Sequence, residues 1–496
     1  MQMLQFVLSA ICLVPQPQKL TELGGRAPEK APIAYVSDKT VPEEGYRLTV
    51  KENGVTIASS GAAGRFYAGK TLEQLFDGRG YPCVEIEDAP RFPWRGVLID
   101  EGRHFLGKVT VKRVLDQMAM HKLNVLHWHL TEDQGWRLDV PGLPDLVRYG
   151  ASRPQTPAYG ARCAHYEKGG PYVIAMDGQR EGPFFYTEAD VREIVAYAAA
   201  RQITVVPEIE VPGHVFALLA AYPQLACFPE NCAKRTPRCE WGIENDVLCV
   251  GNQDGIRLYE RIFDYVCSVF PSKVIHIGGD ECPRVRWKSC PKCQAFMKAH
   301  GMKNEDGLQA WVTRHFADYL AAKGRRILGW DEILAGDVPT SAMGQVWRTS
   351  AKGGAGTAFA TPAESAAKGH DLVMSPITHC YHDYRQGLGE EDPYQYISGR
   401  DGRCITLEKA YAFDPLAGLP ESAWPHVVGG QSNNWGEFTW CHFDLEWKMW
   451  PRACATAEAL WTYPDPARRD YADFRRRMLV HRKRLLAAYV NCASFK

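Results

Sequence analysis

The chain has 496 residues, 45% of them hydrophobic and 23% charged, and its formal net charge is zero. That length allows one large domain and one small domain, with an ample core. A zero charge balance argues against nucleic acid or an anionic membrane as the main partner. No apolar run approaches the ~20 residues that a membrane-spanning helix needs, so no membrane span is expected.

The N-terminal segment 1–13 allows two interpretations. Its apolar run fits the core of a signal peptide, but no basic residues precede it and no clear small-x-small cleavage site follows it. A short structural segment fits equally well. Both interpretations stay open at this point.

Residues 14–90 differ in pattern from the rest of the chain. Alternating apolar residues at 46–50 and 55–57 predict two strands, and residues 52–54 between them predict a hairpin turn. Residues 62–76 then predict a helix. We therefore expect a small α+β domain over 14–90.

From residue 91 to residue 496, short apolar strands alternate with amphipathic helical stretches, and a further basic amphipathic helix is predicted at 471–490. Eight strands separated by helices predict a (β/α)₈ barrel. The predicted helices include 109–123, 188–202, 256–270 and 307–323. The predicted strands are 95–100, 124–130, 203–210, 274–281, 326–330, 343–348, 372–376 and 427–434.

Acids, aromatic residues or arginines stand at the predicted C-terminal ends of all eight strands, which is where such barrels carry out their chemistry. The strand predicted at 274–281 contains two glycines followed by the adjacent acids Asp280 and Glu281. Like charges this close raise the pKa of one carboxyl group, which then stays protonated and able to act as an acid at neutral pH. We therefore predict that the catalytic acid lies here.

Tryptophans at the strand ends indicate a sugar substrate, because aromatic faces stack on pyranose rings while carboxylates and arginine bind hydroxyls. Many glycosidases use two carboxylates that face each other across the sugar. Consecutive strand residues point to opposite sides, so Asp280 and Glu281 are not expected to share that task. A 2-acetamido group on the substrate removes the need for a second acid, since its carbonyl oxygen can attack the anomeric carbon. Glu281 would then protonate the leaving oxygen, and Asp280 would hold the acetamido N–H.

Several motifs together resemble glycoside hydrolase family 20, the β-N-acetylhexosaminidases. The resemblance runs from about Val14, where Val14-Pro-Gln-Pro-Gln-Lys is similar to the start of the family's accessory domain, to about Trp461. The other motifs are Arg95-Gly-Val-Leu-Ile-Asp-Glu-Gly-Arg103, His121-Lys-Leu-Asn-Val-Leu-His-Trp-His-Leu-Thr-Glu132-Asp133-Gln-Gly-Trp136, Pro207-Glu-Ile-Glu210-Val-Pro-Gly-His214, His276-Ile-Gly-Gly-Asp280-Glu281, Gly329-Trp330-Asp-Glu and Trp435-Gly-Glu437.

The resemblance implies a role for each matching residue. Glu281 would be the general acid and base, Asp280 and Tyr381 would contact the acetamido group, and His214 would hydrogen-bond Glu281 with support from Glu132 or its neighbour Asp133. The tryptophans would enclose the acetamido group and the sugar ring, and Arg103, Asp383 and Glu437 would hold the hydroxyls. The catalytic set is thus Glu281, Asp280, His214, Tyr381 and Glu132. The substrate-binding set is Arg103, Asp133, Trp330, Trp347, Asp383, Trp435 and Glu437.

The chain also departs from the family's pattern. Glu132 and Glu210 stand where many members carry Asp, which keeps the charge on a side chain one methylene longer. The accessory domain over 14–90 is short for the family, so its sheet is expected to be incomplete.

Cysteines gather in two places. The first is a polar, proline-containing stretch with Cys227, Cys232, Cys239 and Cys249. The second has one CxxC motif and consists of Cys282, Cys290 and Cys293. The first cluster predicts a loop that is held by disulfides, and therefore an exported protein, periplasmic or secreted. The second cluster has neither a second CxxC motif nor a clear fourth ligand, which a zinc site would need. A disulfide or free thiols are therefore favoured there, and no metal is assigned.

The expected activity is that of an exo-acting, retaining β-N-acetylhexosaminidase that acts on terminal N-acetylglucosamine or N-acetylgalactosamine of a glycan and needs no cofactor. Three alternatives stay open: release of disaccharides such as lacto-N-biose units, a barrel that binds carbohydrate without catalysis, and a metal-dependent hydrolase built on His127 and His129. The oligomeric state, the preferred hexosamine and the natural glycan do not follow from the sequence.

Overall fold

The computed structural model describes residues 11–159, 176–349, 360–387, 404–462 and 469–495. The predicted segment 1–13 therefore lies mostly outside the described residues. Its last residue packs into the fold, since Leu13 is buried in the core of the small domain. The amide of Val14, which follows the segment, donates to Oε1 of Gln74.

The small domain is a five-stranded sheet with one helix against it. The predicted hairpin is confirmed, because β3 (Tyr46–Lys51) and β4 (Gly54–Ser59) pair antiparallel, and α1 (Ala62–Leu75) is the predicted helix. The sheet order is β1-β5-β3-β4-β2. The remaining strands are β1 (Lys19–Ala27), β2 (Ile33–Ser37) and β5 (Tyr81–Asp88).

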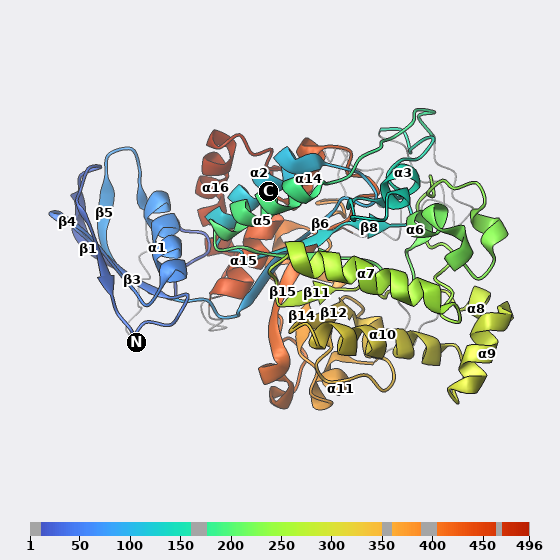
Figure 1. Cartoon of the computed structure of the whole chain (residues 1–496). Helices are drawn as coiled ribbons and strands as arrows, with labels where there is room; N and C mark the ends of the chain where they lie inside the picture. The colour runs from blue at the N-terminus through green and yellow to red at the C-terminus, as the bar shows by residue number, and fades with distance from the viewer. Residues whose placement is uncertain (1–10, 160–175, 350–359, 388–403, 463–468, 496) are drawn as a thin grey trace.

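Eight parallel strands close into a barrel, as predicted, in the order β10-β11-β12-β13-β14-β15-β6-β7 (Figure 1). Apolar side chains such as Trp94, Val125, Val206 and Leu328 form a buried cluster of their own within it. The strands are β6 (Trp94–Asp100), β7 (Val125–His129), β10 (Thr204–Glu208), β11 (Val274–His276), β12 (Arg326–Trp330), β13 (Met343–Val346), β14 (Leu372–Met374) and β15 (Val427–Asn434).

Helices surround the barrel, and their apolar faces complete one large core. Thr187 illustrates how a helix start is specified, because its hydroxyl and the Asp190 carboxylate form a capping box at the start of α5. The described helices are α2 (Gly107–Met120), α3 (Asp145–Gly150), α5 (Glu188–Ala199), α6 (Phe216–Ala221), α7 (Gln253–Val269), α8 (Val285–Ser289), α9 (Pro291–Ala299), α10 (Asp306–Ala321), α11 (Pro362–Ala367), α12 (Ile377–Cys380), α13 (Leu407–Tyr411), α14 (His442–Met449), α15 (Arg452–Trp461) and α16 (Tyr471–Ala487).

A buried and a partly buried ion pair attach the small domain to the N-terminal side of the barrel. Lys122, which precedes β7, lies 2.9 Å from Oδ2 of Asp88, and Arg95 at the start of β6 lies 2.8 Å from Oε1 of Glu44. The indole of Trp461 also donates to Asp88. Figure 1 shows the small domain at the left, whereas the segments that follow the C-terminal strand ends, such as α6 and α8, lie at the right. The small domain therefore does not cover the C-terminal ends of the strands, where a site is expected.

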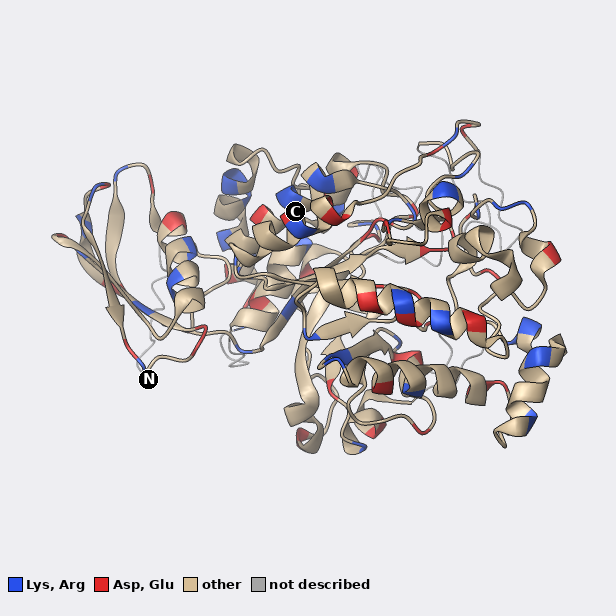
Figure 2. Ribbon diagram, in the orientation of Figure 1, with Lys and Arg blue, Asp and Glu red and all other residues tan. Residues whose placement is uncertain are grey.

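The surface agrees with the zero net charge. Figure 2 shows acidic and basic residues mixed along α7 and α10. Across the described residues, no helix is both long enough and apolar enough to cross a bilayer.

The disulfide-pinned loop is not found: none of the described cysteines, Cys227, Cys232, Cys239 and Cys249 among them, forms a disulfide. Export, which was expected from that loop, stays a prediction.

Candidate active site

The turn after β11 places the two central acids. The strand ends at His276, five residues earlier than predicted, because Gly278 and Gly279 turn the chain with φ of +63° and +91°. A Cβ on Gly278 would lie 1.7 Å from Oε2 of Glu210, so only glycine fits there. Glu281 also has a positive φ of 42°. Asp280 and Glu281 therefore lie in a tight turn, and the expectation that they point to opposite sides of a strand is wrong.

His214 faces both acids. It follows the Pro-Gly turn after β10 with a φ of +51°. Its Nε2 lies 3.7 Å from Oδ2 of Asp280 and 3.9 Å from Oε2 of Glu281. Its Nδ1 donates to Oε1 of Glu132 at 2.8 Å. Burial alone would lower the pKa of His214, but Glu132 and Asp280 together raise that pKa well above its usual value, so the ring stays positively charged.

Asp280 is strongly affected by its surroundings. Burial raises its pKa to about 7; Glu281 adds to the rise, while His214 opposes it. Its Oδ1 is buried and has no hydrogen-bond partner within the described part of the chain. An unpartnered buried oxygen is costly unless a ligand supplies a donor, so Oδ1 is a candidate contact for a substrate N–H.

Four aromatic side chains gather near Asp280: burial raises the pKa of Tyr381, one of the four, and the charge of Asp280 adds to the rise. The centroid of the Trp435 ring lies 5.4 Å from that of Trp330 and 6.3 Å from that of Tyr381, and Tyr381 lies 6.2 Å from Trp347 in a stacked arrangement. The Trp347 indole donates to Oε2 of Glu332 at 3.1 Å. Trp330 is the last residue of β12, Trp347 and Trp435 directly follow β13 and β15, and Tyr381 lies in the segment after β14. Together they form the aromatic cluster that the sequence predicted.

Arg103 is held by several acids beside this cluster. Its Nη1 donates to Oδ2 of Asp100 at 2.8 Å, and its Nη2 lies 3.0 Å from Oε2 of Glu132. Its Nε lies 3.6 Å from Oε1 of Glu437, and its guanidinium lies 5.1 Å from the Trp435 ring centroid. Arg103 is therefore fixed in place and carries its charge beside the aromatic cluster.

Asp383 adds a further acid. Burial raises the pKa of Asp383 to about 7, and nearby Glu437 adds to the rise. Within the described residues, its Oδ1 is buried and has no hydrogen-bond partner. Like Oδ1 of Asp280, this atom is available to a ligand hydroxyl or amide.

Asp133 lies behind His214. It is fully buried, its Oδ1 accepts from the Phe216 amide at 2.9 Å, and its Oδ2 lies 3.5 Å from Nδ1 of His214. It therefore supports the histidine and the start of α6. Its predicted contact with substrate stays a prediction.

A buried polar layer lies beneath the aromatic cluster. Glu208 lies within 2.9 Å of ring nitrogens of His127, His129 and His276, and its Oε1 accepts from the Trp330 indole. His127 and His129 were considered in the sequence analysis as metal ligands. The ligand atoms of His127, Glu208 and His276 lie close enough together to hold a metal ion, and so do those of His129, Glu208 and Glu210. All are fully buried, so they offer no open coordination position to a substrate, which a catalytic metal needs.

Sequence reasoning gave no role to Glu208, Glu210 or Glu332. Glu208 and Glu332 orient the indoles of Trp330 and Trp347, and Glu210 accepts from the Gly279 amide at 3.3 Å. All three stand within the motifs quoted above, but their positions did not reveal which side chains they contact.

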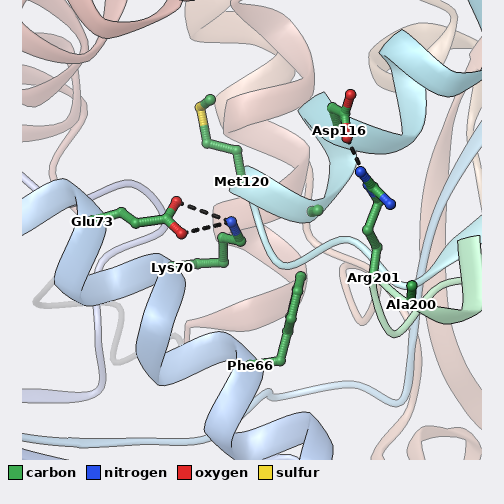
Figure 3. Close-up of a pocket in the computed structure, with 8 residues that line it drawn as sticks. Phe66, Lys70, Glu73, Asp116, Met120, Ala200 and Arg201 are labelled. Atoms are coloured by element: carbon green, nitrogen blue, oxygen red, sulfur yellow. Dashed lines mark hydrogen bonds and ion pairs between the residues drawn. The ribbon is translucent and has the colours of Figure 1, made fainter. Parts of the chain in front are cut away.

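A separate groove of about 370 Å³ lies where the small domain meets the barrel (Figure 3). Phe66, Lys70 and Glu73 of α1 face the turn after α5 across it. Ion pairs, Lys70 with Glu73 and Arg201 with Asp116, occupy its walls. None of its lining residues belongs to the cluster around Asp280, so the groove has no part in that site.

Comparison with family models gives two matches. Residues 92–464 match glycosyl hydrolase family 20, catalytic domain, and residues 17–89 match glycosyl hydrolase family 20, domain 2. The boundary between the two matches agrees with the division between the small domain and the barrel.

Comparison with known proteins gives matches along most of the chain. It is 38% identical over 469 residues to a beta-hexosaminidase of Porphyromonas gingivalis and 34% identical over 485 residues to one of Akkermansia muciniphila. These alignments cover 92% and 96% of this chain. They cover 55% of the first relative, so the chain spans about half of it, and 91% of the second.

Comparison with solved structures finds enzymes of the same kind. A beta-N-acetylhexosaminidase matches with a TM-score of 0.84, 32% identity and 97% coverage of both chains. An exo beta-N-acetylglucosaminidase from Vibrio harveyi, solved with N-acetylglucosamine, matches with a TM-score of 0.83 and 28% identity, covering 98% of this chain and 79% of that one.

Proposed function

Because the chain belongs to glycosyl hydrolase family 20, we propose that it is an exo-acting, retaining β-N-acetylhexosaminidase that works by substrate-assisted catalysis. Its substrate would be a terminal β-linked N-acetylglucosamine or N-acetylgalactosamine on a glycan. The names of its relatives and the solved exo-acting neighbour support this class of substrate.

One observation carries the proposal: the buried, unpartnered Oδ1 of Asp280 beside the aromatic cluster. An acetamido group fits this surrounding, because its methyl group is apolar and its N–H is a donor. Trp330, Trp347 and Tyr381 would contact the methyl and the amide plane, while Asp280 would accept the hydrogen bond from the N–H.

The reaction would then proceed in two steps. The acetamido carbonyl oxygen attacks the anomeric carbon while the bond to the leaving oxygen breaks, and Glu281 gives its proton to that oxygen. The product is a cyclic oxazolinium, whose positive charge ionised Asp280 stabilises. Water then attacks the anomeric carbon, Glu281 takes the proton from the water, and the ring opens to restore the acetamido group with net retention.

His214 places a positive charge close to both acids. At 3.7 Å and 3.9 Å from their carboxylates, the positive ring favours the ionised form of Asp280. Glu132 keeps that ring charged and oriented.

Exo action is supported by the groups around Arg103. Arg103, Asp383 and Glu437 bring donors and acceptors close together, as binding of the hydroxyls of a terminal sugar requires. The fixed position of Arg103 supports recognition of a single ring end.

The test compares initial hydrolysis rates on 4-nitrophenyl β-N-acetylglucosaminide and on the matching β-glucoside. We expect rapid release from the first and none from the second, because only the first carries the attacking carbonyl. Comparable rates on both would overturn substrate assistance. Release from neither, together with release from an aryl lacto-N-bioside, would replace the proposal with a disaccharide-releasing enzyme.

Asp280→Asn provides the matched variant. Asn cannot offer the negative charge, so we expect kcat to fall by about 10²- to 10³-fold, the size typical of losing one transition-state contact. A variant that folds normally and turns over at the wild-type rate would contradict the role of Asp280.

A further inference from the structure

Four cysteines from two separate segments of the chain form a cluster outside the site around Asp280. Cys227 and Cys249 lie on the segment between β10 and α7, where an antiparallel bridge pairs Ala226 with Leu248. Cys290 and Cys293 are the CxxC pair, at the end of α8 and in the first turn of α9. Figure 1 shows α8 and α9 at the end of the molecule opposite the small domain.

The distances between the sulfur atoms define the arrangement. Sγ of Cys293 lies 3.8 Å from Sγ of Cys227 and 3.6 Å from Sγ of Cys249, which lies 3.7 Å from Sγ of Cys290. All four sulfurs lie within 4.8 Å of one another. Four thiolates bound tetrahedrally to Zn²⁺ at about 2.3 Å have sulfurs about 3.8 Å apart, whereas a disulfide holds two sulfurs about 2.05 Å apart.

The surrounding backbone supports bound thiolates. Cys249, Cys290 and Cys293 are at most 1% exposed. The backbone N–H groups of Gly251 and Asn252 lie near the sulfurs of Cys293 and Cys249 and favour their ionised form, and the Asn252 N–H donates to the Cys249 carbonyl oxygen at 2.9 Å. Such donors orient the ligands of a metal site and offset their negative charge.

The loop is also shaped to close on the CxxC turn. A Cβ on Gly251 would lie 2.3 Å from the carbonyl carbon of Lys292 and 2.6 Å from the amide nitrogen of Cys293. Glycine at 251 is what allows the segment after Cys249 to approach the turn that carries Cys290 and Cys293.

We propose that Cys227, Cys249, Cys290 and Cys293 bind one structural Zn²⁺. Four protein sulfur ligands fill a tetrahedral shell and leave no position for a substrate, which is the pattern of a structural site. The ion would join the segment after β10, which carries His214, to the segment after β11, which carries Asp280 and Glu281. Its role would be to hold those two segments together at the rim of the barrel.

The first measurement is the metal content of the full-length chain, purified without chelators from cells supplied with zinc. We expect about one zinc per chain and no stoichiometric iron, as one closed tetrathiolate site predicts. Replacement of the metal with Co²⁺ should produce the visible absorption of tetrahedral cobalt together with thiolate-to-cobalt charge-transfer bands. Stoichiometric iron, or a folded chain that binds neither zinc nor cobalt, would overturn the proposal.

Variants locate the ion. Cys293→Ser should remove zinc and the cobalt charge-transfer bands, and it should lower the Tm. The matched control is Cys267→Ser on α7, whose cysteine is outside the group of four and which should keep its full zinc content. Cys227→Ser is the milder second variant, because Cys227 is partly exposed. Full zinc retention in both Cys227→Ser and Cys293→Ser would contradict the assignment.

A mass measurement under denaturing, non-reducing conditions covers the case in which a variant fails to fold. The denatured, unreduced chain is alkylated before its mass is measured. In the wild-type chain we expect all four cysteines of the group to be alkylated once the metal is released. Disulfides between members of the group in freshly purified protein would overturn the proposal.

Discussion

His214 donates from Nδ1 to Oε1 of Glu132 at 2.8 Å, and both side chains are buried. The opposite nitrogen of the same ring faces Asp280 and Glu281. The charge on Glu132 therefore reaches the two central acids through the histidine, and this relay leads to the first prediction.

Glu132→Gln should change the pH dependence of kcat/KM. Burial alone lowers the pKa of His214, and Glu132 is the largest of the groups that raise it. Without that charge the ring loses its proton at lower pH, and Asp280 loses a nearby positive charge. Because His214 affects Asp280 more than Glu132 does directly, the pKa of Asp280 rises. We expect the acid limb of the pH profile to move to higher pH, measured as kcat/KM on an aryl β-N-acetylglucosaminide.

Two controls accompany this variant. Glu132→Asp keeps the charge and should restore most of the profile, whereas Glu193→Gln changes an exposed glutamate on α5 and should leave it unaltered. Glu132 also contacts Arg103, so a rise in KM alone, with the limb unmoved, would show that only the arginine had been affected.

Glu281→Gln should discriminate between leaving groups. Glu281 supplies the proton that a poor leaving group needs, so we expect kcat on a disaccharide to fall by about 10²- to 10⁴-fold, the usual contribution of a general acid. A dinitrophenyl leaving group needs no proton and should show a much smaller loss in the first step. Pre-steady-state and steady-state rates on both substrates provide the measurement. Equal losses on the two substrates would show that Glu281 is not the proton donor.

Asp280→Asn should stabilise the fold at alkaline pH. The pKa of Asp280 is about 7 in the folded chain against 3.8 as its ordinary value. Below pH 3.8 both states are protonated and the carboxyl group does not penalise folding. As pH rises toward 7, the unfolded chain ionises first, so the wild-type protein loses stability that the uncharged Asn retains.

The measurement is Tm against pH for both proteins. We expect the Tm of Asp280→Asn to exceed that of wild type above pH ~7 and the difference to shrink toward pH ~4. Asp318→Asn, on the exposed side of α10, is the control and should show no such trend. A Tm difference that does not vary with pH would argue against the raised pKa.

Gly278→Ala should damage both stability and activity. Its Cβ would meet the carboxylate of Glu210 at 1.7 Å, so the turn that carries Asp280 must move. Gly324→Ala is the matched control, because Gly324 has a similar φ of +69° but nothing within 4 Å of an added Cβ. The control measures only the backbone strain, about 1–2 kcal/mol.

Chemical denaturation and kcat/KM check this pair. We expect Gly278→Ala to lose clearly more unfolding free energy than Gly324→Ala and to lose activity, while Gly324→Ala remains active. Similar results for both variants would mean that the close approach of Glu210 does not determine the turn.

The secondary structure was largely predictable because it follows local patterns. All eight barrel strands, the hairpin over 46–59 and the C-terminal helix were found where apolar periodicity placed them. The error at β11 has a physical cause, since an apolar run does not show that Gly278 and Gly279 take positive φ. Because of these two glycines, Asp280 and Glu281 lie in a turn and do not alternate along a strand as expected.

The cysteines show the limit of local patterns most clearly. Spacing grouped Cys282 with the CxxC pair and left a fourth ligand missing. In the structure, Cys227 and Cys249 meet that pair, and Cys282 instead packs against the turn at Gly213. Cys227 and Cys293 are 66 residues apart, and no local pattern connects them.

The sequence by itself determined the alternation of strands and helices, the polar strand ends and the acids at 280 and 281, because each is a property of a few consecutive residues. Only the tertiary structure decided which of these side chains touch. Barrel closure places β10 beside β11, with Glu208 opposite His276, and thereby brings His214 to the two acids and two distant loops to one group of four sulfurs. Those contacts depend on the positions of whole strands and loops in space, which no run of neighbouring residues specifies.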